Sequence, residues 1–267
     1  MIKLENISYK YPDGTLALEN ISIDFSRGKC VGIIGENGAG KSTLLLNTLG
    51  ILKPSSGYIL FNDEKIKYNN AFMKKYRSEV NLMMQDPDRQ IFYSTVEEDV
   101  GFALRNLDYS EDEIEERVKH ALKIVGLTDI RKKSVNLLSY GQKKRVALAG
   151  LLVMDLKILF MDEPTAGLDP AMVTSMKKLL YNLMDSGIKL IISSHDMDFI
   201  YEICDYIYLL KNGKLVKEGK ESEVFLNADF IHSISLEQPS LVRLHMNTDL
   251  PLFKYESELY DYLDDRS

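Results

Sequence analysis

The chain has 267 residues, of which 45% are hydrophobic and 27% are charged, as is ordinary for a globular protein with one catalytic unit and some additions. Its formal net charge of −7 argues against a surface that binds nucleic acid. The two cysteines, Cys30 and Cys204, are far apart in the sequence, so we expect neither a disulfide framework nor a Cys-x-x-Cys site, as suits a reducing compartment.

The N-terminal region predicts a hairpin followed by a buried strand. Residues 1–25 alternate apolar and polar side chains around the turn Pro12-Asp-Gly14, a pattern typical of two antiparallel strands. Tyr11 lies directly before that turn. The apolar run Val31-Gly-Ile-Ile34 then predicts a strand that leads into a glycine-rich loop, and Gly57–Phe61 predicts a further strand.

The glycine-rich loop matches the pattern G-x-x-x-x-G-K-[ST] between this strand and a helix-like run from Thr43. Backbone N–H groups of such a loop form a concave anion site, and the helix directs its unpaired N–H groups to the same point. We expect Lys41 to neutralise the outer phosphates and the Ser42 hydroxyl to reach Mg²⁺. The loop therefore predicts a nucleoside triphosphate site made by Gly35, Glu36, Asn37, Gly38, Ala39, Gly40, Lys41, Ser42 and Thr43.

From residue 95 to about 150 the pattern becomes helical. Thr95 with Glu98, and Ser110 with Glu113, predict capping boxes at the starts of two helices. Gly126 ends the second helix. Its expected buried face consists of Ile114, Val118, Ala121, Leu122 and Val125. The basic clusters 131–133 and 143–145 are short, and we interpret them as solvated ends of helices or loops.

The segment Leu138-Ser-Tyr-Gly-Gln142 predicts a second phosphate site at the start of another helix. Ser139 and Gln142 form a capping box. At an outward-facing helix N-terminus, the hydroxyl and N–H groups of Ser139 and Gly141 are suited to bind a γ-phosphate. Because the first loop already serves the chain's own nucleotide, we expect this segment to serve the nucleotide of another copy of the fold. The alternative is an ordinary capped helix.

A short apolar strand at 158–161 ends in two acidic residues, Asp162 and Glu163. Strands buried on both faces have this composition, and their carboxyl ends are where open α/β sheets bind ligands. Asp162 can support Mg²⁺, because this cation prefers oxygen ligands and retains water. Glu163 can orient or deprotonate an attacking water. The alternative, two solvated acids, is the weaker interpretation beside a complete phosphate loop.

The remaining pattern continues the alternation of helices and strands. Asp169 and Pro170 predict a helix start. Its expected core stripe is Met172, Met176, Leu179, Leu180 and Leu183. Residues 206–210, followed by Asn212-Gly213, predict a final hairpin. From about residue 219 short apolar clusters precede an acidic end, as expected for a docked tail.

Taken in order and spacing, these motifs resemble the ATPase subunit of ABC transporters over residues 1–218. The motifs are the phosphate loop, Gln85 after 80–84, the signature segment 138–142, Asp162-Glu163, Ala166-Gly-Leu-Asp169 and Ser194-His195. The resemblance implies an α/β fold: a P-loop NTPase with a RecA-like mixed sheet core, an antiparallel β subdomain and an inserted helical signature subdomain. Tyr140 stands where the family usually has a glycine.

The resemblance also implies roles for individual residues. Tyr11 would stack on adenine, and Gln85 would contact Mg²⁺ and sense the transport partner. Asp169 would lie across the dimer seam, beside Ser139, Gly141 and Gln142 at the partner's ATP. His195 would contact the γ-phosphate and the attacking water, so that Glu163, His195 and Gln85 are the catalytic candidates. Without the resemblance, Tyr11 could be an ordinary hairpin aromatic and Gln85 a surface amide. His195 could be a polar residue near a helix start.

A narrower resemblance concerns segments 85–92, 95–99 and 142–150, which are similar to the energy-coupling-factor branch and most of all to its cobalt-type subunit. It implies an ATP-hydrolysing, energy-coupling subunit of an importer, with cobalt as cargo. Nickel or vitamin import by the same branch, and a soluble ABC ATPase without a transport role, are the alternatives. A GTPase is disfavoured because no Asn-Lys-x-Asp guanine motif is found.

The expected organisation is an ATPase domain at 1–218, with a helical subdomain at about 95–150, and a C-terminal extension at 219–267 that helps to pair two ATPase subunits. The implied partners are an identical or paralogous ATPase subunit, an integral membrane subunit that docks at 85–92, and a separate substrate-binding membrane component. The longest apolar stretch, 146–161, is interrupted by Asp155 and Lys157, so no segment is expected to span a bilayer. We expect a peripheral protein at the cytoplasmic face of the plasma membrane.

Overall fold

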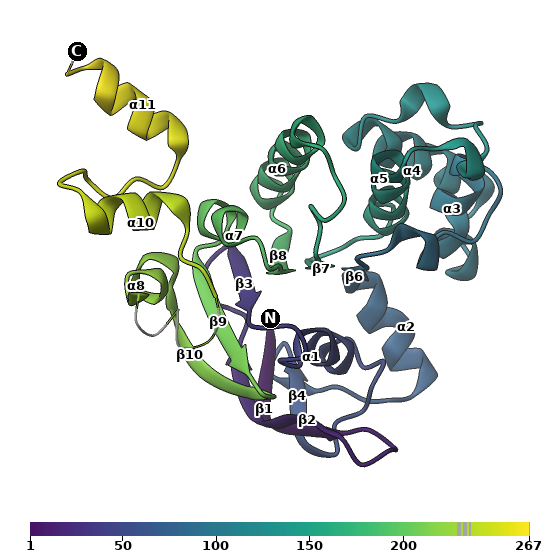
Figure 1. The fold of residues 1–267 in the computed structure, drawn as a ribbon. Helices are drawn as coiled ribbons and strands as arrows, with labels where there is room; N and C mark the ends of the chain where they lie inside the picture. The colour runs from purple at the N-terminus through teal and green to yellow at the C-terminus, as the bar shows by residue number, and fades with distance from the viewer. Residues whose placement is uncertain (229–230, 232–233, 235, 267) are drawn as a thin grey trace. The chain divides into compact units, whose positions relative to one another are not determined.

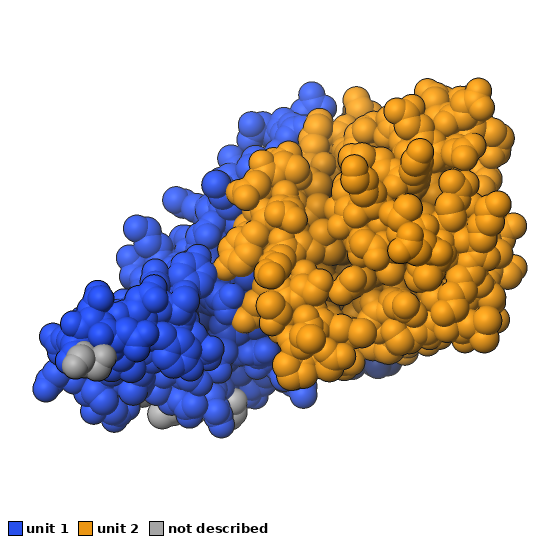
Figure 2. Space-filling model, turned by 90° about the horizontal axis from the view of Figure 1, so that it is seen from above, with its two compact units in different colours: residues 1–66, 191–267 blue, residues 67–190 orange. Residues whose placement is uncertain are grey.

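The structure is a computed structural model that describes residues 1–228, 231, 234 and 236–266 (Figure 1). The chain forms two compact units (Figure 2). Unit 1 comprises residues 1–66 and 191–267, and unit 2 comprises residues 67–190. Within the described ranges, no helix combines the length and the apolar character needed to cross a membrane.

Unit 1 contains a four-stranded antiparallel sheet in the order β2-β1-β4-β5. Its strands are β1 (Ile2–Lys10), β2 (Leu16–Asp24), β4 (Ser56–Phe61) and β5 (Glu64–Lys65). The predicted hairpin is confirmed, because β1 pairs with β2 and places Lys10 opposite Leu16. Alternation along the strands buries one face of apolar side chains, among them Leu4, Ile7 and Ile21.

A second group of strands in unit 1 positions the phosphate loop. Strand β3 (Cys30–Ile34) is buried along its whole length and runs parallel to β9 (Tyr206–Lys211). Strand β9 pairs antiparallel with β10 (Lys214–Lys220), which confirms the predicted final hairpin. Beyond β3 the chain passes through the loop into helix α1 (Lys41–Thr48), the strand–loop–helix order that the motif predicts.

The two cysteines lie together in unit 1, although 174 positions separate them in the sequence. Their sulfur atoms are 3.6 Å apart, and both residues are buried free thiols. Burial raises the pKa of the Cys204 thiol well above its usual range. The pair packs as small apolar side chains, a proximity that sequence spacing did not indicate.

The C-terminal segment docks on unit 1, as predicted for a docked tail. Unit 1 also contains α7 (Met197–Ile203), α8 (Glu221–Phe225), α10 (Ser240–Asn247) and α11 (Glu256–Asp264). The Asp198 carboxylate accepts hydrogen bonds from Ser240 N (2.5 Å) and Ser240 Oγ (3.0 Å). Lys254 Nζ donates to the Cys204 carbonyl and pairs with Glu221, each at 3.2 Å. These contacts hold residues 240–254 against α7 and α8.

Unit 2 combines two parallel strands with a group of helices. Strand β6 (Val80–Met83) runs parallel to β7 (Ile158–Asp162). The helices are α2 (Asn70–Glu79), α3 (Val96–Asn106), α4 (Glu111–Ile124), α5 (Tyr140–Leu152) and α6 (Pro170–Asp185), with 3-10 turns at 87–89, 128–130 and 135–137. Strand β8 (Lys189–Ser193) begins in unit 2 and ends in unit 1.

The helix starts of unit 2 follow local sequence signals with one exception. The capping box of α4 is present, with Ser110 N donating to Glu113 Oε2 at 3.0 Å. The Asp169 carboxylate accepts from Met172 N at 2.8 Å and caps α6. The capping box predicted at Thr95 is wrong, although α3 begins there. The Thr95 hydroxyl instead donates to the Glu98 carboxylate at 2.6 Å, which leaves it no part in capping the backbone.

Candidate functional site

The predicted site residues are divided between the two units. Tyr11, the phosphate loop and His195 belong to unit 1. Gln85, the signature segment, Asp162, Glu163 and Asp169 belong to unit 2.

In unit 1, the phosphate loop folds around the ammonium group of its own lysine. Lys41 Nζ donates to the carbonyl oxygens of Gly35 (2.7 Å) and Glu36 (3.0 Å). Gly38 and Gly40 have φ of 80° and 101°, the left-handed conformations that turn successive N–H groups of a loop inward. Ser42 is exposed at the start of α1, where a hydroxyl can reach a ligand of the loop.

Tyr11 lies beside the phosphate loop, at the end of the first strand. Its hydroxyl is 3.0 Å from Thr43 Oγ1, and its ring packs edge-on against Tyr9 with centroids 5.0 Å apart. The hairpin therefore brings an aromatic ring to the loop, where stacking on adenine remains a prediction.

His195 opens onto the same pocket as the phosphate loop. This pocket of about 440 Å³ is lined by Gly35, Glu36, Asn37, His195, Asp196, Met197, Asp198, Leu236, Glu237, Gln238 and Arg243. Asp196 caps α7 by accepting from Phe199 N at 3.0 Å, and Asp196 N donates to Ser194 Oγ at 3.2 Å. His195 is exposed just before this fixed helix start. The structure thus brings two motifs of the predicted site together within unit 1.

In unit 2, Glu163 directly follows strand β7 in a strained conformation. Its φ is 49°, in the left-handed region that non-glycine residues rarely occupy. Its exposed fraction is 9%, and the neighbouring Asp162 is half-buried at the strand end. A buried carboxylate held in a strained backbone is a frequent property of functional sites.

Lys144 of helix α5 fixes the loop that follows Glu163. Its ammonium donates to three backbone carbonyls, those of Glu163 (2.9 Å), Pro164 (3.1 Å) and Ala166 (2.8 Å). Its side chain is fully buried, and burial lowers the pKa of Lys144 to about 8 against the opposing effect of the Glu163 charge. The interpretation of the 143–145 cluster as solvated is therefore wrong for Lys144. Three carbonyl acceptors offset the cost of burying its charge.

The signature segment forms the predicted cap but faces outward only in part. Ser139 is exposed and caps α5: its hydroxyl accepts from Gln142 N (3.3 Å), and Gln142 Oε1 accepts from Ser139 N (3.0 Å). Gly141 is buried, contrary to the expectation that it faces outward. A Cβ at this position would lie 2.3 Å from the sulfur of Met172, so a larger residue here would force the Met172 side chain of α6 to move.

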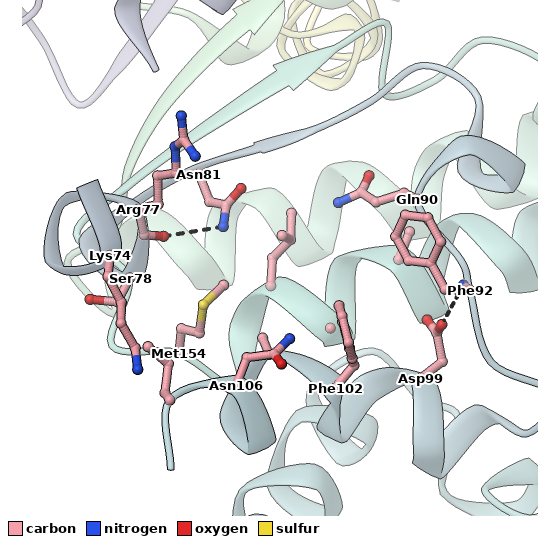
Figure 3. Close-up of a pocket in the computed structure, with 15 residues that line it drawn as sticks. Lys74, Arg77, Ser78, Asn81, Gln90, Phe92, Asp99, Phe102, Asn106 and Met154 are labelled. Atoms are coloured by element: carbon pink, nitrogen blue, oxygen red, sulfur yellow. Dashed lines mark hydrogen bonds between the residues drawn. The ribbon is translucent and has the colours of Figure 1, made fainter. Parts of the chain in front are cut away.

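Gln85 is exposed on a loop that neighbouring side chains hold in shape. The Gln90 amide accepts from Met84 N (3.0 Å) and donates to the Leu82 carbonyl (3.2 Å). Asp99 of α3 accepts from Phe92 N at 2.7 Å (Figure 3). The same oxygen accepts from Tyr93 N at 3.0 Å. Burial raises the pKa of the Asp99 carboxyl.

A pocket of about 580 Å³ lies next to this loop within unit 2 (Figure 3). Phe92 and Phe102 border one part of it, and Lys74 and Arg77 border the other. Its remaining lining residues are Ser78, Asn81, Gln90, Asp99, Ala103, Asn106, Leu107, Ala147, Gly150, Leu151 and Met154. The exposed fraction of Phe92 is 71%, so the loop presents a large apolar ring to the surroundings.

Comparison with known proteins decides the family. A family model described as ABC transporter matches residues 18–166 of the chain. This chain belongs to the ABC transporter family.

Relatives place the protein within this family. The chain is 44% identical to an energy-coupling factor transporter ATP-binding protein, EcfA2, of Clostridium perfringens, over 91% of this chain and 86% of the relative. It is 41% identical to the cobalt import ATP-binding protein CbiO of Salmonella paratyphi A, over 97% and 96% of the two chains.

Solved structures agree with this placement. CbiO1 of Clostridium perfringens, described as part of the ABC transporter complex cbiONQ, matches with a TM-score of 0.79 and 43% identity over 92% of this chain and 98% of that chain. The ATP-binding cassette MJ0796, a dimer bound to ADP and phosphate, matches with a TM-score of 0.75 and 28% identity over 83% and 99%.

Membership in the ABC family confirms the predicted fold class and the ATPase activity. The protein is an ATP-binding ATPase of the energy-coupling-factor branch, with an antiparallel sheet, a sheet rich in parallel strands and an inserted set of helices.

The sequence did not indicate two residues that support the predicted site. Lys144 and Asp99 each hold a loop that carries a predicted site residue, through hydrogen bonds to backbone atoms. Lys144 stands between Lys143 and Arg145, where its burial is not visible locally. Asp99 lies in the first turn of α3, where an acidic residue is also expected for the helix dipole. Periodicity carried one signal for Lys144: it lies four residues before Leu148, on the buried face of α5.

Proposed function

We propose that this ABC ATPase is the energy-coupling subunit of an energy-coupling-factor importer that carries cobalt. The observation that carries the nucleotide chemistry is the shared pocket of the phosphate loop and His195. Similarity to a cobalt import ATP-binding protein over 97% of the chain supports cobalt as cargo. Nickel and vitamin import by the same branch are the alternatives.

The nucleotide is bound by the phosphate loop. Lys41 neutralises the outer phosphates once ATP replaces the loop carbonyls as its partner, and Tyr11 stacks on adenine. The α1 N-terminus adds unpaired N–H groups and a partial positive charge.

The residues predicted to hold a magnesium ion all carry oxygen donors. Ser42 offers a hydroxyl, Gln85 an amide oxygen and Asp162 a carboxylate, all of the hard type that Mg²⁺ prefers. When bound, this ion neutralises charge on the transferring phosphoryl group.

The chemical step relies on Glu163 and His195. Glu163 orients the attacking water and accepts its proton, while His195 contacts the γ-phosphate. A positioned base contributes typically about 10²–10⁴ in rate, and the rest of the step is positioning and charge stabilisation. ADP and phosphate are the products.

Each site is completed by a second ATPase subunit. Ser139, at the α5 N-terminus, binds the γ-phosphate of the partner's ATP, with Gly141 N–H and Gln142 beside it. Asp169, exposed at the start of α6, lies across the dimer seam. The dimeric form of a related cassette supports this arrangement. Paired subunits close when both hold ATP and open after hydrolysis, and the C-terminal segment contributes to pairing.

The pocket beside the Gln85 loop takes a helix of the integral membrane subunit. Phe92 and Phe102 suit the apolar face of such a helix, and Lys74 and Arg77 suit an acidic residue at its end. This contact holds the ATPase peripherally at the cytoplasmic face of the membrane. A separate membrane component selects the cargo.

Uptake into vesicles tests the proposal. The chain is co-expressed with its membrane subunits, and ATP-driven uptake of radiolabelled cobalt, nickel and a labelled vitamin is compared. Cobalt uptake that Glu163→Gln abolishes supports the full assignment, whereas uptake of nickel or vitamin alone overturns the cargo. Binding of DNA without membrane association overturns the transporter role.

Docking is tested with a matched pair of variants. Phe92→Asp should abolish recovery with membranes, while Leu137→Asp should not, although the exposed fractions of the two side chains are 71% and 70%. Leu137 does not line the pocket. Equal recovery of both variants would contradict docking at this surface.

A further inference from the structure

The departure from the family pattern at Tyr140 creates contacts that a glycine cannot make. The Tyr140 hydroxyl donates a 3.1 Å hydrogen bond to the backbone carbonyl of Gln85. All groups concerned belong to unit 2. The signature segment is thereby joined directly to the loop that carries Gln85.

The other side of the Tyr140 ring meets the segment that follows Glu163. Gly167 has φ of 74°, and a Cβ on it would lie 2.9 Å from Cε1 of the Tyr140 ring. The ring therefore lies flush against the backbone of Gly167, between the catalytic candidate and Asp169. The positive φ favours a glycine at 167, and an added Cβ would require the Tyr140 ring to move.

Lys144 connects these contacts to Glu163 itself. Its Nζ lies 5.5 Å from the centroid of the Tyr140 ring and binds the carbonyls of Glu163, Pro164 and Ala166. A cation near the face of an aromatic ring is attracted to it, most strongly where water is excluded. Tyr140 and Lys144 are one turn apart on α5, so they act from the same helix.

A second link on this helix runs to the Gln85 loop. Lys143 Nζ pairs with Asp88 at 2.7 Å. Asp88 is the middle residue of the 3-10 turn at 87–89. The N-terminal turn of α5 thus contacts residues 85–92, the Gln85 docking loop, through Tyr140 and Lys143. It contacts the Glu163–Gly167 loop through Tyr140 and Lys144. Tyr140 is the residue common to both.

We propose that Tyr140 is a positioning residue that couples the Gln85 docking loop to the Glu163–Gly167 loop through helix α5. Movement of the docking loop pulls on the hydroxyl, and the ring transmits that displacement to the backbone beside Glu163. The coupling rests on the proposed roles of Gln85 and Glu163. It gives a role to Tyr140, which stands where the family usually has a glycine.

Amide hydrogen exchange of the purified chain tests the coupling. Tyr140→Phe removes only the hydroxyl, so exchange should rise about fivefold at 85–92, which corresponds to about 1 kcal/mol, the typical net worth of a hydrogen bond. Tyr140→Gly should raise exchange at both 85–92 and 163–168. Tyr109→Phe, which removes a hydroxyl elsewhere in unit 2, should alter neither. Changes confined to 139–145 in both Tyr140 variants would overturn the proposal.

ATP turnover provides the functional readout. Tyr140→Phe should lower kcat about fivefold, on the same estimate, with KM for ATP unchanged. KM should stay unchanged because Tyr140 is not among the residues proposed to bind the chain's own ATP. An unchanged kcat would overturn the coupling. A wild-type chain without Glu163-dependent hydrolysis would instead overturn the proposed function, and the exchange result would still stand on its own.

A double-mutant comparison separates the ring contact from backbone strain. Gly167→Ala is strained at φ of 74° in any background. With Tyr140 present, overpacking should enlarge the loss of turnover by a further factor of about five or more, since overpacking costs typically about 1–3 kcal/mol. In the Tyr140→Gly background this extra loss should vanish. Equal losses in the two backgrounds would show that the ring does not press on Gly167.

Discussion

Lys144 Nζ lies 2.9 Å from the backbone carbonyl oxygen of Glu163, and this hydrogen bond holds a residue whose φ is 49°. A left-handed conformation costs a non-glycine residue about 1–2 kcal/mol. Bonds from the same ammonium to Pro164 and Ala166 help to offset that cost. The backbone that carries the proposed base is therefore held by a lysine from helix α5.

Replacing the proposed base should separate ATP binding from hydrolysis. Glu163→Gln should keep ATP affinity, slow turnover at least about a hundredfold because a positioned base is lost, and accumulate a closed dimer. Steady-state phosphate release and sedimentation with ATP measure these effects. The control Glu116→Gln changes an exposed carboxylate on α4 and should behave as wild type. Unchanged hydrolysis would remove Glu163 from its role.

Removing Lys41, the lysine of the phosphate loop, should weaken the binding of ATP. Lys41→Ala takes away the ammonium that lies within 3.0 Å of two loop carbonyls, so ATP affinity should fall at least about tenfold, because a charge-assisted hydrogen bond contributes about 1.5–3 kcal/mol. Calorimetric titration with ATP measures this. Lys119→Ala, an exposed lysine of α4, is the control. Near-normal affinity of Lys41→Ala contradicts the assignment of the loop.

The pH dependence of folding stability should reveal the buried lysine. Burial lowers the pKa of Lys144 to about 8 in the native state, below about 10.4 for an unfolded lysine. Between these values the native state binds fewer protons than the unfolded state, so rising pH favours folding. Wild type should gain up to about 3 kcal/mol relative to Lys144→Met across this range, at about 1.36 kcal/mol per pH unit.

Urea denaturation at several pH values from about 7 to 10 measures that difference. The stability of Lys119→Met should change with pH in parallel with that of wild type, because the Lys119 side chain is exposed. A Lys144→Met curve parallel to wild type would mean that Lys144 keeps its ordinary pKa.

The shape of the docking loop should depend on one oxygen of Asp99. Asp99→Ala leaves Phe92 N and Tyr93 N without their acceptor, which should cost about 1–3 kcal/mol of stability and raise exchange at 91–94. Asp99→Asn retains an acceptor oxygen for the two N–H groups and also removes a buried charge. It should therefore lose less stability than Asp99→Ala. Urea denaturation and exchange measure both variants. If the two variants lose stability equally, the hydrogen bonds do not hold the loop.

Local rules determined much of this protein from the sequence by itself. The hairpin at Pro12-Asp-Gly14, the capping box of α4 and the Asp169 cap of α6 each need only neighbouring residues. The strand–loop–helix around Lys41 is also local, because backbone N–H groups and a helix start make the anion site. Order and spacing of the motifs then sufficed to identify the ABC family.

Tertiary structure alone decided which side chains meet across the chain. Tyr140 and Gln85 are 55 positions apart, Cys30 and Cys204 are 174 positions apart, and no local pattern pairs them. No local pattern distinguishes Lys144 from Lys143 and Arg145, and only the packing of α5 gives it three carbonyl acceptors. The physical reason is that burial and partner choice depend on how elements pack, whereas turns, caps and strand periodicity depend on adjacent residues.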